Sequence, residues 1–101
     1  MPAFIRTLPI GYATEAAVAT TGADFAIPTT GIRAKIVRVN TSAAGFVGFG
    51  MDDSPPAAST SNCVYHASGE IDYLLDDGHS FTHVYVYSVS STLVAYVSFL
   101  G

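Results

Sequence analysis

Charge is scarce in this chain. Of its 101 residues, four are Lys or Arg and eight are Asp or Glu, so charged residues make up 12%. An average soluble domain has roughly 25% charged residues. With so few cations and a net charge of −4, the chain cannot neutralise a nucleic-acid backbone. We therefore expect no nucleic-acid partner.

Cysteine and long hydrophobic runs are also nearly missing. Cys63 is the only cysteine, so no disulfide framework within the chain supports the fold. No apolar run reaches the ~18 residues that are needed to cross a bilayer. The N-terminal segment lacks the basic region and the hydrophobic stretch of a signal peptide. We expect no membrane partner, and synthesis and assembly in a cytoplasm.

Strand-forming residues dominate what is present. β-branched and aromatic residues are interrupted at short intervals by Gly, Ser, Thr, Asn and Asp, which is typical of an all-β protein. We predict a single domain, residues 1–101, that forms an antiparallel β-sandwich or jelly roll of about eight short strands. Residues 1–31 are expected to form an N-terminal arm or edge strands. The segments expected as strands are 4–8, 23–27, 32–41, 45–51, 62–67, 70–76, 81–90 and 92–100; residues 14–19 are expected to form a loop or an edge strand.

The two last segments are apolar on both faces. In 92–100, Leu93, Ala95, Val97 and Phe99 alternate with a set that includes Val94 and Tyr96. In 81–90, Val84 and Val86 alternate with Phe81, His83, Tyr85 and Tyr87. A two-layer sandwich buries only one face of each sheet. The second face must therefore be covered by something else.

Two explanations account for this second face. Long loops, above all the proline-containing segment 52–62, could fold back over it. Alternatively, another subunit could cover it, because tyrosine is enriched at protein interfaces and monomers rarely expose large apolar patches. The low charge favours subunit contact. We predict Phe81, Tyr85, Tyr87, Val94 and Tyr96 as subunit-interface residues.

No residue pattern predicts catalysis. His79, His83 and a nearby Asp could form a metal site, but a strand does not bring positions 79 and 83 onto one point, so His79 is expected to face solvent. There is no G-x-S-x-G nucleophile motif and no phosphate-binding glycine loop. We expect no enzyme activity, no catalytic residues, no metal and no cofactor. The absence of reaction chemistry favours an interaction or structural role.

The order of parts in residues 32–101 resembles the small virion proteins of tailed bacteriophages, of the capsid decoration or cement type. The resemblance lies in "VRVNTSAAGFVGFG" (37–50), the Pro/Ala/Ser/Thr-rich loop after it, and "ASGEIDYLLDDGHSFTHVYVYS" (67–88). It implies a β-sandwich or jelly-roll head-auxiliary subunit in the virion, on the capsid surface. Its implied partners are further copies of itself, as a homotrimer, and the major capsid protein. It brings no catalytic residues.

Two alternatives remain open at this stage. A tail adaptor or fibre-base subunit would have the same kind of fold, and copy number per particle would distinguish it. A carbohydrate-binding β-sandwich module would use Tyr85, Tyr87 and Tyr96 as a stacking platform for sugar rings. The chain contains no Trp, which weighs against the carbohydrate-binding module.

Overall fold

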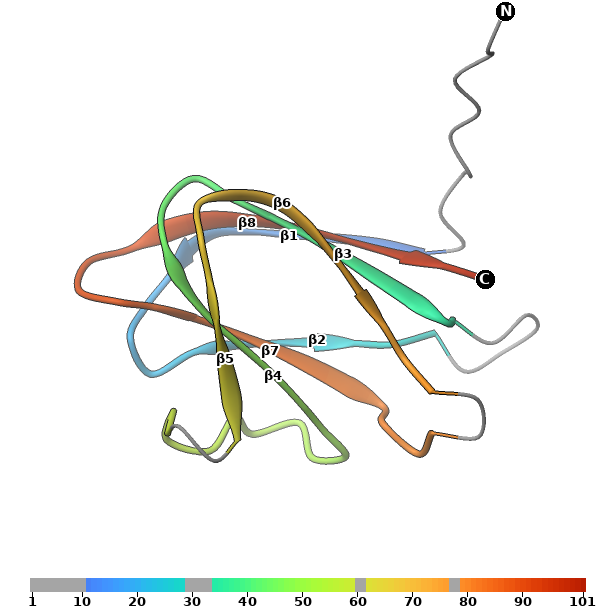
Figure 1. Ribbon diagram of the computed structural model, residues 1–101. Helices are drawn as coiled ribbons and strands as arrows, with labels where there is room; N and C mark the ends of the chain where they lie inside the picture. The colour runs from blue at the N-terminus through green and yellow to red at the C-terminus, as the bar shows by residue number, and fades with distance from the viewer. Residues whose placement is uncertain (1–10, 29–33, 60–61, 77–78) are drawn as a thin grey trace, which may run out of the picture.

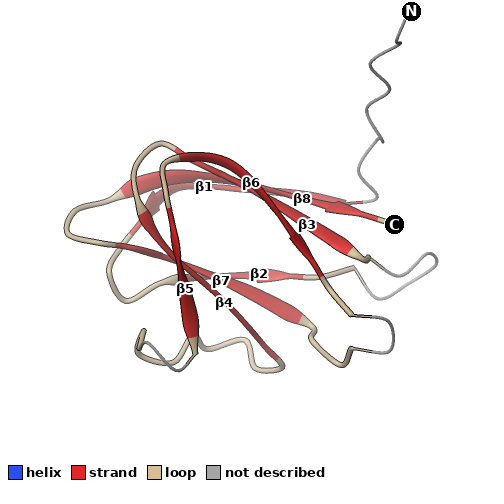
Figure 2. Ribbon diagram, viewed as in Figure 1, coloured by secondary structure: helices blue, strands red, loops and turns tan. Residues whose placement is uncertain are grey.

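The structure, a computed structural model, describes residues 11–28, 34–59, 62–76 and 79–101. These residues form eight strands joined by loops (Figure 2). They contain no helix that is long and apolar enough to span a membrane. In chain order the strands are β1 (Gly11–Val18), β2 (Ala23–Ala26), β3 (Ile36–Thr41), β4 (Gly45–Gly50), β5 (Cys63–His66), β6 (Gly69–Leu74), β7 (His83–Ser88) and β8 (Leu93–Leu100).

The strands form two antiparallel four-stranded sheets that lie over one another as two layers (Figure 1). Sheet A has the order β1-β8-β3-β6, and sheet B has the order β2-β7-β4-β5. The first strand therefore pairs with the last, the second with the seventh, the third with the sixth, and the fourth with the fifth. This is the strand order of a jelly roll, in which one long hairpin is wrapped into two sheets. The predicted all-β sandwich class is confirmed.

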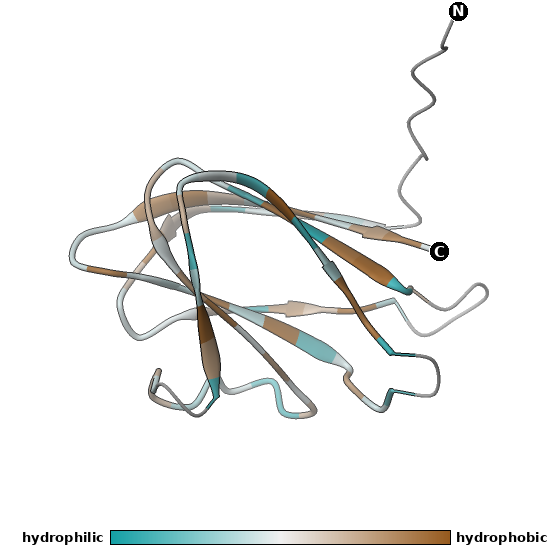
Figure 3. Cartoon of the chain, viewed as in Figure 1, coloured by the Kyte–Doolittle hydropathy of each residue, from teal (hydrophilic) through white to brown (hydrophobic). Residues whose placement is uncertain are grey.

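The hydrophobic core lies between the two sheets. Successive side chains of a strand point to opposite faces, and on β8 the inward set is Leu93, Ala95, Val97 and Phe99, all buried. Figure 3 shows hydrophobic residues on strands of both sheets and hydrophilic segments along β6, where Glu70 and Asp72 point outward. The core also contains Val18, Phe25, Ile27, Ala34, Val37, Val39, Val47, Leu75, Val84 and Val86.

Strand β1 lies where the sequence left two alternatives open, a loop or an edge strand. Residues 14–19 were ambiguous in the sequence, and the structure places residues 11–18 in an edge strand of sheet A. Its alanine-rich sequence lacks a clear two-residue hydrophobic period, so its extended form depends on pairing with β8. The segment 4–8, which we predicted as a strand, lies outside the described residues.

Candidate functional site

The outer face of β7 is covered by the chain itself. Tyr85 is 4% exposed and Tyr87 is 0% exposed, and both hydroxyls reach the loop that connects β4 to β5. Tyr85 Oη donates to the carbonyl oxygen of Asp52 at 2.5 Å and accepts from the N–H of Asp52 at 3.2 Å. Tyr87 Oη donates to the carbonyl oxygen of Pro56 at 2.8 Å. Burial raises the pKa of Tyr87 to about 12, so the hydroxyl remains a donor at neutral pH.

Glycines make room for these two rings. A Cβ on Gly50 would lie 2.5 Å from Tyr85 Oη, and a Cβ on Gly22 would lie 2.6 Å from the ring of Tyr87. Gly22 also has a φ of +94°, which side chains other than that of glycine rarely adopt. The tyrosine rings therefore lie against bare backbone while the loop covers them from outside.

Of the two explanations for the second apolar face, loop coverage applies to Tyr85 and Tyr87. The other predicted interface residues are more accessible: Phe81 is 39% exposed, Tyr96 is 44% exposed, and Val94 is half-buried. The structure does not bring the five residues together. Tyr85 and Tyr87 lie on sheet B, Val94 and Tyr96 lie on the outer face of sheet A, and Phe81 precedes β7.

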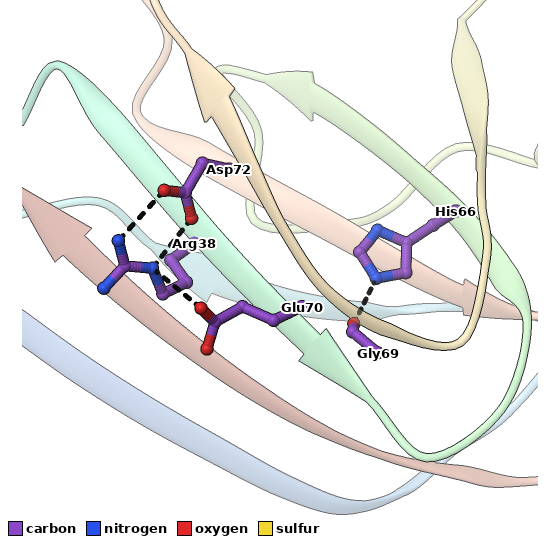
Figure 4. A network of polar contacts seen from close by, with 5 residues as sticks. All are labelled: Arg38, His66, Gly69, Glu70 and Asp72. Atoms are coloured by element: carbon purple, nitrogen blue, oxygen red, sulfur yellow. Dashed lines mark hydrogen bonds and ion pairs between the residues drawn. The ribbon is translucent and has the colours of Figure 1, made fainter.

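The outer face of sheet A combines tyrosines with an ion-pair network. Arg38 on β3 donates from Nε and Nη2 to the two carboxylate oxygens of Asp72 on β6, at 2.7 and 2.9 Å. Glu70 lies 3.5 Å from Arg38 Nε (Figure 4). The hydrogen bond with Asp72 raises the pKa of Arg38. Tyr12 and Tyr96 are exposed on β1 and β8, beside this network.

Strands β5 and β6 diverge from their shared turn (Figure 1). A groove lined by aromatic rings lies among β4, β5, β6 and the segment before β7. It consists of two hollows, of about 510 and 560 Å³, which share Phe49, Tyr73 and Phe81. We call this surface the aromatic groove. Around the first hollow are also Leu74, Leu75, Asp76, His79 and Ser80; around the second are Val47, Gly48, Asn62, Cys63 and Val64.

The rings of the aromatic groove contact one another. The ring centroid of Phe49 lies 5.9 Å from that of Tyr73 and 5.7 Å from that of Phe81, within the range of favourable aromatic pairs. His79 stacks on Phe81 and its Nε2 bonds the carbonyl oxygen of Ala34 at 3.2 Å. The expectation that His79 faces solvent is therefore wrong, because ring stacking and this hydrogen bond hold it against the protein.

His66 is a buried titratable group at the corner between the sheets. It is fully buried, and Figure 4 shows its ring pointing at Gly69. His66 Nε2–H donates to the carbonyl oxygen of Gly69 at 3.0 Å, so Nδ1 accepts from Tyr73 Oη at 2.6 Å. Burial lowers the pKa of His66 and raises that of Tyr73. These shifts fit a structural hydrogen-bonded pair that closes the turn between β5 and β6.

The described residues contain no group of three or more His, Cys, Asp or Glu side chains that could hold a metal ion. His83 Nδ1 instead lies 2.7 Å from Asp24 Oδ1, while His79 lies in the aromatic groove. The two-residue period of the strands places Phe49 on the same face as Val47, and Tyr73 on the same face as Ile71. This period carries no information on whether the edge between the two sheets is open, because the separation of β5 from β6 is not a property of either segment.

Comparison with protein-family models, with curated proteins and with solved structures found no match.

Proposed function

We propose that this chain is a structural subunit of a bacteriophage virion, a capsid cement or decoration protein. It binds other copies of itself, as a homotrimer, and the major capsid protein at the capsid surface. It stabilises the head by burying apolar and aromatic surface across subunit boundaries. The proposal assigns the chain no catalytic step and no cofactor.

The observation that carries the proposal is the exposure of large apolar side chains on a surface with little charge. Tyr65 is 63% exposed and Leu74 is 77% exposed, while the whole chain has only twelve charged residues. Each 100 Å² of such surface removed from water contributes about 2.5 kcal/mol, less the cost of association. The exposed large apolar residues are Tyr12, Met51, Val64, Tyr65, Leu74, Phe81, Val89 and Tyr96.

Two measurements test the proposal. Intact particles from the phage that encodes this chain should contain it, at tens to hundreds of copies if it belongs to the head. Light scattering of the purified chain should give the mass of a trimer. Absence from intact particles contradicts the virion role. About three to twelve copies per particle would instead favour a tail adaptor or fibre-base subunit.

A carbohydrate-binding module is the second candidate, and the aromatic groove is what favours it. Phe81 and Tyr73 line this groove beside the polar groups of Asp76 and Ser80. The platform that the sequence suggested is reduced to Tyr96, because Tyr85 and Tyr87 are covered by the loop. Binding of the soluble chain to a glycan array, with loss of binding in Phe81→Ala, would support this candidate over the structural role.

A further inference from the structure

We infer that the aromatic groove binds residues 4–10 of a second copy of this chain. Two adjoining hollows with three shared rings form an elongated surface, which suits an extended segment better than a compact ligand. Val64 on its wall is 53% exposed, and its pairing with the core residue Val47 turns its side chain toward the groove. A peptide laid along the groove would remove this side chain from water.

The composition of residues 4–10 complements the groove. The segment reads FIRTLPI, with four large apolar residues and one charge, the cation Arg6. Among the described lining residues, the groove also carries one acidic group, Asp76, which is exposed. Apolar side chains can enter the two hollows while Arg6 pairs with Asp76 at the rim. This arrangement leaves no isolated charge in an apolar site.

The position of β1 indicates that the segment comes from a second copy. Gly11 pairs with Phe99, Phe99 with Val37, and Val37 with Tyr73. Gly11 and Tyr73 are thus separated by three strand spacings, about 14 Å. An extended chain covers at most about 3.5 Å per residue. Crossing that width within one chain would use about four residues, 7–10, and would keep Leu8 and Ile10 out of the groove.

This inference adds to the proposed function one contact by which the subunits would associate. It rests on that function only for the assumption that copies of the chain associate with one another. Val64 lines the second hollow and pairs with the core residue Val47, so its side chain faces the groove. The native Cys63 instead faces the outer side of sheet B, where a Cβ on Gly48 would lie 3.2 Å from its Sγ. The double variant Cys63→Ser/Val64→Cys therefore places a reporter thiol in the groove. A second cysteine placed in the segment 4–10 should form a disulfide with it if the segment binds there.

The experiment uses the full-length variant Leu8→Cys/Cys63→Ser/Val64→Cys, oxidised gently with a copper–phenanthroline reagent and analysed by non-reducing electrophoresis and peptide mass mapping. We expect a link between residue 8 of one chain and residue 64 of another. It should be at least tenfold more abundant than a link to residue 64 in the control, which carries Val89→Cys in place of Leu8→Cys. Val89 is also exposed, at 51%, and it lies just after β7. The double variant Leu8→Cys/Cys63→Ser, which keeps Val64, lacks the reporter thiol, so it removes the expected link and identifies any 8–8 dimers.

Each outcome of this experiment either supports or overturns the inference. A link from residue 8 to residue 64 between two chains supports it, and Phe81→Asp should lower that link at least fivefold while Val89→Asp leaves it unchanged. A link within one chain overturns the second copy as the occupant. No link to residue 64, from Leu8→Cys or from Ile5→Cys in its place, overturns the groove as the binding site. The wild-type chain can still be found in particles in either case, so failure here is distinct from failure of the proposed function.

Discussion

At the scale of single residues, the tyrosines of β7 show how the hydrogen-bonding need of a buried hydroxyl determines which segment packs over it. Tyr85 and Tyr87 carry polar atoms that lose water when the rings are buried, and each needs a hydrogen-bond partner. Backbone groups of Asp52 and Pro56 supply these partners. Main-chain atoms of the loop thus make the hydrogen bonds to the two tyrosines, so the loop's side chains are not needed for these bonds.

The Tyr87–Pro56 hydrogen bond can be tested by Tyr87→Phe. The change removes the hydroxyl but keeps the buried ring, so we expect the free energy of unfolding to fall by about 1 kcal/mol, measured by urea denaturation. The matched control is Tyr12→Phe, at a tyrosine that is 61% exposed, where the change should stay within about 0.5 kcal/mol. Equal effects at both positions would contradict the importance of this hydrogen bond.

His66 makes stability depend on pH. Its folded pKa is lowered by burial from an ordinary value of about 6.5, so below that value the unfolded chain binds more protons than the folded chain. The contribution of neutral His66 is therefore complete above about pH 6.5 and is lost as pH falls toward the folded pKa. We expect the free energy of unfolding to decrease between pH 7 and pH 5, measured in urea.

The control for this pH dependence is His66→Gln. The variant should be less stable at pH 7, because Tyr73 and Gly69 lose their partner, but its stability should fall less between pH 7 and pH 5. An unchanged pH slope in His66→Gln would show that other groups are responsible. An NMR titration of the wild type should give a His66 pKa below 6.5.

At the scale of elements, the loop between β4 and β5 acts as part of the fold. It covers the outer face of sheet B, which otherwise would expose two tyrosine rings. Asn62 fixes the far end of the loop, where its side chain accepts from the N–H of Ser59 at 2.9 Å and donates to the carbonyl oxygen of Ala57 at 3.1 Å. Pro55 and Pro56 restrict the backbone between these anchor points.

Replacing both prolines tests this role. In Pro55→Gly/Pro56→Gly the hydrogen bond from Tyr87 to the backbone remains available, but the loop gains freedom in the unfolded chain. We expect a loss of about 1 to 2 kcal/mol in the free energy of unfolding. We also expect increased binding of a dye for exposed apolar surface under native conditions. Unchanged dye binding together with reduced stability would show that the loop still covers the tyrosines.

At the scale of the whole molecule, β8 connects strands that are distant from it in the sequence. It lies inside sheet A, between β1 and β3, and Phe99 near the C-terminus pairs with both Gly11 and Val37. The fold therefore cannot close until the last strand is present. Pairing of sequence-distant strands of this kind makes folding slow compared with helical proteins.

A circular permutant tests whether folding depends on the pairing of β8 or on the place of β8 at the end of the sequence. Joining Gly101 to Met1 and opening the chain between Ala57 and Ala58, which are exposed, keeps every strand pair. We expect cooperative unfolding of this permutant by circular dichroism. Truncation after residue 91, which removes β8, should leave no cooperative transition. A cooperative transition in the truncated chain would contradict the central role of β8.

The sequence by itself determined the strands whose hydrophobic residues alternate. The inward faces of β6 and β8 follow from the two-residue period of Ile71 and Tyr73 and of Val97 and Phe99. Low charge and the lack of reaction motifs determined which functions to propose.

Only the tertiary structure decided three further features. The strand at 11–18 depends on pairing with β8, the loop over Tyr85 and Tyr87 depends on hydrogen bonds to residues some thirty positions away in the sequence, and the aromatic groove depends on the divergence of β5 from β6. The physical reason is the same in each case. Backbone pairing, burial and open surface arise between segments that are distant in the chain, so local periodicity carries no information about them.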